Sequence, residues 1–593
     1  MSSTERNNCH VESSPKDEVE TSNMNEMNIT CQNTNKTYEV PMGTSLKAFA
    51  ERHKAEISDP SFGSGGILAA IVDNRLKELG FKIMEPHTVR FIGYGHPDGR
   101  RTWVRTLCFV LQNVVSEMFP DKVLAIDYSL PSGLYCEIRE LEHLEDGRHV
   151  IHQVSDEEIA GIKIRMEEII KADLPIEKVK MRAEDVEEFY KKRHQSEKIN
   201  LMHTLGRFSY SVYFLDGQAD TFYGPLLAST GNLGLFDIVG FNDGFCLQFP
   251  MDGNMDKLLP MKKQSKIATA LKEHSDWCAM MGVAGVGTLN KVVQKGRIVE
   301  LINLCESLHE RKYAEIADQI YARREEEKIV FIAGPSSSGK TSTSKRLALQ
   351  CRILGLNPKV IELDNYFVDR EHTPKDENGQ FDFESLYAMD LDFLGQQLNQ
   401  LLDGKEIELP KFDFKEGCRR FEGTRMRLQD KDILIMEGIH ALNPAMIPGV
   451  DNSKVFRVYA SALTSLSIDE NNNISTSDNR MLRRMIRDNR TRGISPEQTL
   501  ERWQSVRRGE NRNIFPFQEN ADAVFNSAHL FELPVLKYYA EPLLRRIAPN
   551  SPAYTEATRL LKFLDYIVAL SPSEIAAIPP TSILREFIGG QTL

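Results

Sequence analysis

Residues 329–350 combine a short β-branched run, a Gly- and Ser-rich turn and a helical pattern, in the order IVFIAGPSSSGKTSTSKRLALQ. The turn, GPSSSGKT, matches the G-x-x-x-x-G-K-[ST] pattern of a phosphate-binding loop, and it has the flanking strand and helix that this loop requires. Gly334 and Gly339 allow backbone amides to curl round a phosphate, and the following helix presents unpaired amides to the negative charge. The sequence therefore predicts a nucleotide-binding α/β domain that starts at Ile329.

The residues of this turn have separate expected roles in binding ATP. Lys340 is expected to neutralise the β- and γ-phosphate oxygens, and Thr341 to ligate Mg²⁺. A Ser-rich structural turn is the alternative interpretation, and the flanking strand and helix weigh against it. The predicted ATP-binding residues are Gly334, Pro335, Ser336, Ser337, Ser338, Gly339, Lys340, Thr341 and Ser342.

Two further apolar runs lead to acidic residues, at the strand ends where parallel sheets place catalytic groups. The run KVIELDNYF leads to Asp364, the predicted general base, because a carboxylate there can accept the proton of an acceptor hydroxyl. The run DILIMEG delivers Glu437 beside the loop, where an acid can hold Mg²⁺ directly or through water. For both residues the alternative is a strand-end acid that bonds to a turn.

The segment DNRMLRRMIRDNRTRG carries six arginines at spacings that put several on one helical face. Uncompensated, these charges would repel one another. A mobile helix that closes over a triphosphate would explain them, since phosphoryl transfer requires charge neutralisation and exclusion of water. The alternative is a solvated or RNA-binding basic face. The arginines are Arg480, Arg483, Arg484, Arg487, Arg490 and Arg492, of which the last four join Asp364 and Lys340 as predicted catalytic residues.

The composition of the whole chain bears on nucleic-acid binding, on the state of the cysteines and on membrane contact. A formal charge of -12 over 593 residues argues against a generally basic nucleic-acid-binding surface. The nine cysteines contain no CxxC pair and suit reduced thiols. The sequence shows no signal-peptide pattern and no apolar run near the roughly 20 residues of a membrane helix, so we expect a cytoplasmic protein without membrane contact.

The motifs GPSSSGKT, LDNYF, GQFDFE, LPKFDF, ILIMEG and the arginine segment together resemble the uridine kinase and phosphoribulokinase family over about 328–545. The resemblance implies a doubly wound parallel sheet with helices on both faces, ATP as donor and a nucleoside as acceptor. It also implies roles for individual side chains: Asp364 as the base, Glu384 on the ribose and Phe412 on the nucleobase. Tyr366 and Arg483 complete the expected substrate-binding set.

Two departures from the family pattern concern the acceptor. Gly417 stands where uridine-cytidine kinases carry a base-recognising His, so the preferred nucleobase stays open. Glu384 replaces a family Asp at the ribose, and its longer side chain is expected to alter the position of the sugar.

The N-terminal half is similar to the front end of threonyl-tRNA synthetases, on the segments DGRRTWVRTLCFVLQNVVSEMFP, IKADLPIEKVKM and FYGPLLASTG. That similarity implies a TGS-like domain over 28–95 and an editing-like α+β domain over 96–300. Where editing domains carry their histidine and cysteine ligands, this chain has Thr102, Thr106, Phe222 and Leu226, which cannot replace a histidine at a metal. The expectation is a retained scaffold without hydrolase chemistry, in an arrangement that we associate with bacterial-type uridine kinase-like nucleoside kinases.

The predicted organisation is therefore a disordered tail over 1–27, the two synthetase-like domains, a connecting helix over 301–328 and a kinase domain over 329–593. The stretch GVAGVGTLN at 282–290 resembles a nucleotide loop only loosely, because no strong strand precedes it, and is interpreted as a structural turn. About the last 45 residues give no usable signal.

Three functional hypotheses follow. The first is an ATP- and Mg²⁺-dependent kinase that phosphorylates the 5′-hydroxyl of a nucleoside, with uridine or cytidine first, in pyrimidine salvage. The second is a nucleotide-gated regulatory protein whose TGS-like half binds RNA or ribosomes. The third, hydrolysis of misacylated tRNA, is disfavoured by the missing ligands. We also expect the N-terminal half to gate the kinase or to build a homo-oligomer, because long amphipathic helices such as 299–328 often pack between domains.

Overall fold

The computed structural model describes residues 26–251, 254–261, 265–375, 379, 381–413, 415–464 and 466–593. Most of the predicted disordered tail lies outside these residues, whereas Glu26 and Met27 already belong to the first strand. Within the described part of the chain, no helix is both long enough and apolar enough to cross a membrane.

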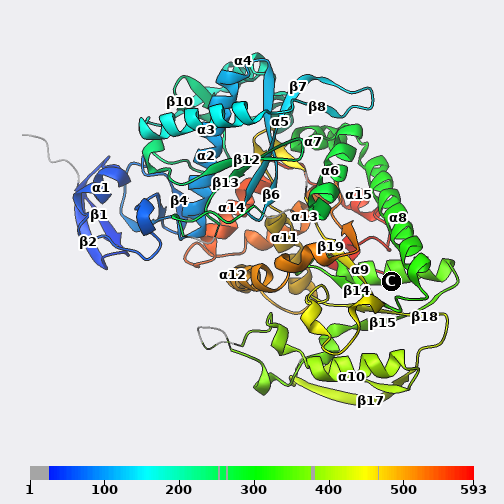
Figure 1. Cartoon of the computed structure of the whole chain (residues 1–593). Helices are drawn as coiled ribbons and strands as arrows, with labels where there is room; N and C mark the ends of the chain where they lie inside the picture. The colour runs from blue at the N-terminus through cyan, green and yellow to red at the C-terminus, as the bar shows by residue number, and fades with distance from the viewer. Residues whose placement is uncertain are drawn as a thin grey trace, which may run out of the picture.

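A five-stranded parallel sheet forms the centre of the C-terminal half (Figure 1). The strand with the phosphate-loop sequence lies in the middle, with two strands on each side. Every neighbouring pair is parallel, as buried β-branched runs predict. Across the sheet the strands are β15 (Asn357–Glu362), β18 (Asp432–Glu437), β14 (Ile329–Ala333), β19 (Val455–Ser461) and β22 (Ala523–Asn526).

Helices cover both faces of this sheet, which confirms the predicted doubly wound architecture. Val330 and Ile332 of β14 pack into one core cluster, while Ile329 and Phe331 pack into another on the opposite face. The first cluster takes side chains from α8 (Ile298–Arg323), α9 (Lys340–Ile353), α11 (Thr476–Thr491), α12 (Pro496–Asn513), α13 (Glu532–Leu544) and α14 (Tyr554–Leu564). The second takes them from α6 (Ser265–Met280) and α10 (Leu391–Leu402).

The first five strands form a small mixed sheet at one end of the molecule (Figure 1). Lys36–Pro41 forms a strand, and a turn leads from it to the helix Leu46–Arg52. The fold's identification as a TGS domain stays a prediction. Its elements are β1 (Glu26–Cys31), β2 (Lys36–Pro41), α1 (Leu46–Arg52), β3 (Ala69–Val72), β4 (Arg75–Lys77) and β5 (His87–Ile92).

The next segment contains two antiparallel sheets and helices packed against them. Ser155 and Glu158 form a reciprocal capping box at the start of α3. The elements are α2 (Pro97–Met118), β6 (Lys122–Leu130), β7 (Gly133–His143), β8 (His149–Ile151), α3 (Asp156–Lys171), β9 (Glu177–Arg182), α4 (Ala183–Lys192), α5 (Ser196–Leu205), β10 (Ser209–Leu215), β11 (Gln218–Asp220), β12 (Asp237–Phe241) and β13 (Gly244–Gln248).

Four positions were compared with the metal ligands of editing domains: Thr102, Thr106, Phe222 and Leu226. Their side chains pack inside the protein core. The hydroxyl of Thr106 donates to the carbonyl of Thr102 and accepts from the amide of Leu227. Phe222 makes an edge contact with Phe109, and Leu226 is buried in the same cluster.

The predicted boundary at residue 300 does not coincide with a break in packing. α6 lies against β22 and α7 (Val286–Gln294) joins the same core cluster as α9, although both helices precede the boundary. The prediction of a structural turn over 282–290 is wrong for its second half, because 286–290 belongs to α7 and only 282–285 lies outside a helix. The division into domains stays a prediction.

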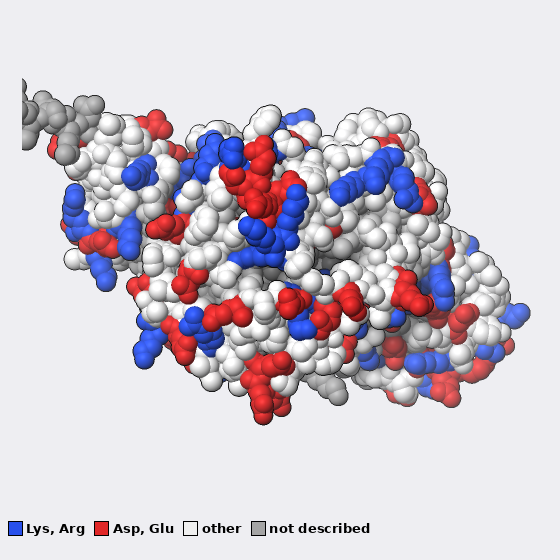
Figure 2. Space-filling model, turned by 90° about the horizontal axis from the view of Figure 1, so that it is seen from above, with Lys and Arg blue, Asp and Glu red and all other residues white. Residues whose placement is uncertain are grey.

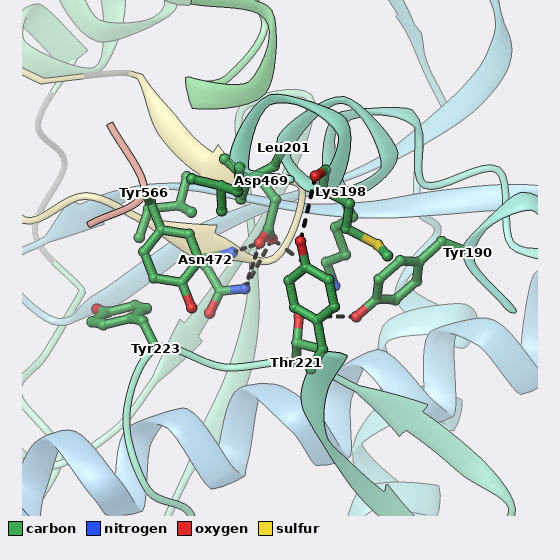
Figure 3. Close-up of a pocket in the computed structure, with 12 residues that line it drawn as sticks. Tyr190, Lys198, Leu201, Thr221, Tyr223, Asp469, Asn472 and Tyr566 are labelled. Atoms are coloured by element: carbon green, nitrogen blue, oxygen red, sulfur yellow. Dashed lines mark hydrogen bonds and ion pairs between the residues drawn. The ribbon is translucent and has the colours of Figure 1, made fainter. Parts of the chain in front are cut away.

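The N-terminal and C-terminal halves of the chain contact each other through buried polar side chains (Figure 3). The hairpin of β20 (Ser467–Asp469) and β21 (Asn472–Asn473) leads into α11. Lys198 of α5 donates to Asp220 and, across 2.8 Å, to Asn471 in this hairpin. A hollow of about 370 Å³, open to solvent, adjoins these side chains and is lined by aromatic side chains that include Tyr190, Tyr210, Tyr223 and Tyr566.

The remaining elements belong to the C-terminal half. They are the hairpin of β16 (Ile407–Asp413) and β17 (Cys418–Met426), and the short helices α15 (Pro572–Ala576) and α16 (Leu584–Ile588).

Candidate active site

The turn between β14 and α9 adopts the conformation expected of a phosphate-binding loop. Ser337 and Gly339 have φ angles of 59° and 84°, which turn the backbone through the left-handed region. A Cβ atom at Gly334 would lie 1.9 Å from the carbonyl oxygen of Ala460, so only glycine fits there. The loop is thereby packed tightly against the end of β19.

Two buried arginine–glutamate pairs hold the loop's carbonyl groups. Arg480 donates to the carbonyl of Ser336 across 3.0 Å and pairs with Glu510, whose Oε1 accepts from the amide of Ser336. Arg483 reaches the carbonyl of Ser337 and pairs with Glu532 across 2.7 Å. Both guanidinium groups are almost fully buried. Glu510 and Glu532 compensate the charges of these two arginines. The two side chains therefore do not belong to the mobile helix of unpaired arginines, closing over a triphosphate, that the sequence predicts.

This placement corrects the expectation for Arg483. Its guanidinium group donates hydrogen bonds to Glu532 and Ser527 inside the core, so the side chain supports the loop and does not face an acceptor. The local sequence gave no signal for this role, because the partner acids lie 30 to 49 residues further along the chain.

Two further arginines of α11, and the arginine that directly follows this helix, gather around one buried acid. Arg484, Arg487 and Arg492 all lie within 3.6 Å of Asp488 carboxylate oxygens. Arg484 also donates to the hydroxyl of Ser336 across 2.8 Å. Three cations share one carboxylate, which leaves a local excess of positive charge beside the loop. Such an excess suits an anionic ligand.

Glu437 lies at the end of β18, next to the start of α9. Its Oε1 accepts a hydrogen bond of 2.6 Å from the hydroxyl of Thr341. Burial raises the pKa of this carboxyl to about 7, against the opposing attraction of Lys340. The described residues contain no group of three or more His, Cys, Asp or Glu side chains that could hold a metal. Mg²⁺ commonly takes one or two protein oxygens together with water and phosphate, so this pair fits it.

Asp364 follows β15 in the short 3₁₀ turn Leu363–Tyr366. It is exposed, yet the surrounding protein excludes enough water to raise the pKa of its carboxyl, while Lys340 and Arg492 act in the opposite direction. The ammonium of Lys340 lies 3.5 Å from the carbonyl of Pro335 in the loop. The charges of Asp364, Lys340 and Glu437 thus act on one another across the end of the sheet.

Glu384 is also brought to this end of the sheet. Asn513 of α12 donates to its carbonyl across 2.6 Å. Burial and the charge of Glu510 raise the pKa of the Glu384 carboxyl to about 7, while Arg484 and Lys340 lower it.

Tyr366 is placed differently from its predicted role. It is buried in the core, and its hydroxyl donates to Gln397 across 2.8 Å, so it faces α10 and not an acceptor. Phe412 is half-buried on β16, with its ring 5.8 Å from that of Phe367.

At Gly417, φ is +74° and an added Cβ would lie 2.8 Å from Nε of Arg370. A histidine at this position would therefore need Arg370 to move.

A contact between the last residues and the loop helix has no counterpart among the predicted site residues. Glu586 accepts hydrogen bonds from the amide and the hydroxyl of Ser342, at 3.3 and 2.5 Å. No motif marks this segment, because the contact depends on how the chain returns after α15.

Comparison with known proteins agrees with this geometry. The model of the phosphoribulokinase / uridine kinase family matches residues 329–532. The uridine kinase of Bacillus cytotoxicus is 32% identical over 197 residues, which are 33% of this chain and 84% of that protein. The chain belongs to the phosphoribulokinase / uridine kinase family. A second family member, the uridine kinase of Staphylococcus carnosus, is 30% identical over 33% of this chain and 85% of its own length.

Two solved structures are also similar to the family region. One, described as a possible uridine kinase from Bacillus stearothermophilus, is 20% identical over 36% of this chain and 98% of that chain, with a TM-score of 0.25. The other, D-glycerate 3-kinase from Cryptococcus neoformans, is 13% identical over 43% of this chain and 87% of that chain, with a TM-score of 0.21.

Proposed function

We propose that this protein is an ATP-dependent kinase that transfers the γ-phosphate of MgATP to the 5′-hydroxyl of a nucleoside, with uridine or cytidine as the first candidates, in pyrimidine salvage. The observation that carries the proposal is the set of Lys340, Asp364 and the pair Thr341–Glu437 around one phosphate-binding loop. Relatives named uridine kinases, at 28 to 32% identity, support the choice of acceptor.

Each part of the set has a role in the reaction. The loop amides and Lys340 hold the phosphates, and the arginines around Asp488 neutralise charge on the transferring group. Asp364 accepts the proton of the acceptor hydroxyl while the oxygen of that hydroxyl forms a bond to the γ-phosphorus. The bond from the γ-phosphorus to the bridging oxygen breaks, and ADP leaves. Thr341 and Glu437 would hold Mg²⁺, which would supply positive charge to offset the charge of the phosphates.

The acceptor side is assigned to Glu384 and Phe412. A carboxylate suits the ribose hydroxyls as a hydrogen-bond acceptor, and a half-buried aromatic ring suits a planar base. Because Gly417 provides no base-reading side chain and Arg370 passes beside it, we expect selectivity among bases to differ from that of uridine-cytidine kinases.

The RNA-linked alternative has less support. On the face seen in Figure 2, basic and acidic side chains are interspersed, so the described residues of that face offer no continuous basic track. The TGS-like identity, RNA contact and a homo-oligomer remain proposals for the N-terminal half.

Nucleoside phosphorylation by the purified full chain tests the proposal. Mg²⁺-dependent conversion of one nucleoside to its monophosphate, lost in Asp364→Asn, is the expected result. A panel of ribo- and deoxyribonucleosides without turnover, in a protein that binds ATP, would contradict the acceptor class.

A further inference from the structure

The last residues of the chain lie beside α9, the helix that follows the phosphate-binding loop (Figure 1). Ile583, Leu584 and Phe587 are buried in the same cluster as α9 and α11. Lys345 of α9 donates to the backbone carbonyl of Leu593 across 3.0 Å. The segment 582–593 is therefore anchored by apolar packing on one side and by α9 on the other.

Glu586 projects from this segment to the start of α9. Its Oε2 accepts from both the amide and the hydroxyl of Ser342, and Gln591 donates to the same hydroxyl across 2.8 Å. Ser342 is the third residue of α9, so its amide is among those without a partner inside the helix. Such amides are the groups that a phosphate-binding loop offers to a nucleotide. A carboxylate thus occupies a predicted phosphate contact.

The same segment also engages an arginine of the predicted catalytic set. Arg490 donates to the carbonyls of Glu586 and Phe587, at 3.0 and 3.2 Å. The guanidinium of Arg483 lies 5.0 Å from the ring centre of Phe587, next to the loop carbonyl that it holds. One segment therefore contacts the helix N-terminus and the arginine helix together.

We propose that residues 582–593 form an autoinhibitory segment whose Glu586 carboxylate occupies the phosphate position at Ser342, so that a nucleotide must displace it to bind fully. The inference rests on the proposed function only in placing a nucleotide at this loop. A carboxylate and a phosphate cannot share one amide, and two anions at that distance repel each other. Displacement would also release Arg490 from the two carbonyls and make it available to the nucleotide.

The opposing interpretation is that the segment is a permanent wall of the nucleotide site. The two interpretations predict opposite changes in nucleotide affinity and in the mobility of residues 582–593. For an inhibitory segment, removal of the charge at Glu586 strengthens nucleotide binding, and a nucleotide loosens residues 582–593. For a wall, the same substitution leaves binding unchanged or weakens it, and a nucleotide protects the segment.

The test is MgATP binding to the full chain by calorimetry, for wild type and Glu586→Gln. Glutamine keeps the size and a hydrogen-bond acceptor but removes the charge. We expect the Kd to fall by about tenfold, the effect of one charge-assisted hydrogen bond exchanged for a neutral one. Glu574→Gln is the matched control, since this residue caps α15 within the same C-terminal region and is expected to leave the Kd unchanged.

Hydrogen–deuterium exchange gives a second readout that needs no variant. Peptides from 582–593 are expected to exchange faster when MgATP is added, whereas loop peptides from 334–342 are expected to exchange more slowly. An unchanged or higher Kd for Glu586→Gln, or slower exchange of 582–593 with ATP, would overturn the inference.

Failure of this inference is distinguishable from failure of the proposed function, because neither readout requires an acceptor. Tighter ATP binding by Glu586→Gln without any nucleoside turnover would leave the inhibitory segment standing and contradict the nucleoside kinase. Nucleoside turnover together with no gain in ATP affinity in Glu586→Gln would support the nucleoside kinase and contradict the inhibitory segment.

Discussion

The hydroxyl of Thr341 and the carboxylate of Glu437 meet across 2.6 Å, and this contact joins the phosphate-binding loop to the neighbouring strand β18. Thr341 is the second residue of α9, which follows β14, and Glu437 is the last residue of β18. Because β14 and β18 pair in parallel, their carboxyl ends lie at the same edge of the sheet. The two oxygens form the part of the site that suits Mg²⁺.

Glu437→Gln is expected to lower kcat by about 10- to 100-fold and to raise the Mg²⁺ concentration needed for half-maximal rate, because glutamine keeps the Thr341 contact but loses the charge. Steady-state rates over a Mg²⁺ titration measure both effects. Glu422→Gln, at an exposed surface pair with Lys411, serves as control and should match wild type. Equal Mg²⁺ dependence in the two variants would exclude Glu437 from the metal site.

Asp364→Asn is expected to lower kcat by roughly 10²- to 10⁴-fold with little change in ATP affinity, since the amide cannot accept the acceptor's proton. Because the pKa of Asp364 is raised, its ionised form is lost at a higher pH than for an ordinary Asp. The wild-type kcat should therefore fall as the pH is lowered through that raised pKa. A variant as active as wild type would remove Asp364 as the base.

Arg483→Met is expected to destabilise the protein by about 3 to 5 kcal/mol, because it leaves Glu532 buried without a partner. Urea unfolding measures the loss. Arg502→Met, on the exposed side of α12, should change stability by less than about 0.5 kcal/mol. If Arg483→Met kept full stability and lost only acceptor affinity, the side chain would act on the substrate after all.

A double variant separates the lost pair from the lost packing. Glu532→Leu added to Arg483→Met removes the unpaired charge and is expected to recover part of the stability. Further loss in the double variant would contradict the assignment of Glu532 as the partner.

Acid should destabilise the protein through a buried imidazole pair. His309 and His529 stack at 4.0 Å, and burial holds the pKa of each well below its ordinary value, with Arg346 and Arg483 acting in the same direction. In the unfolded chain each of these two histidines binds a proton near pH 6.5, whereas in the folded chain it does not. Stability is therefore fully present above that pH and decreases on acidification, by about 1.4 kcal/mol per pH unit for each histidine.

Urea midpoints at pH 7.5, 6.5 and 5.5 test this. His309→Phe keeps an aromatic ring against Phe525 and should flatten the pH slope by about one proton. An unchanged slope in His309→Phe would refute the buried pair as its source.

Local patterns predicted the elements that depend on neighbouring residues. The loop GPSSSGKT lies between strand β14 and helix α9, the run to Glu437 forms β18, and the arginine segment forms α11. These elements follow from hydrophobic period and glycine positions within short windows.

Roles that depend on distant partners could not be predicted in the same way. The hydroxyl of Tyr366 points to Gln397, 31 residues away, and Ser342 meets Glu586 across 244 residues. A regular spacing of arginines likewise does not distinguish charges that face a ligand from charges paired in the core. Such pairings are set by tertiary packing.

The central claim is nucleoside phosphorylation at this loop, and the most direct measurement is formation of ADP and nucleoside monophosphate by the purified full chain with MgATP and a nucleoside panel. We predict stoichiometric formation of the two products with at least one pyrimidine nucleoside, and its loss in Lys340→Ala and Asp364→Asn. ATP binding without monophosphate formation from any nucleoside, or equal rates in wild type and both variants, would contradict the account.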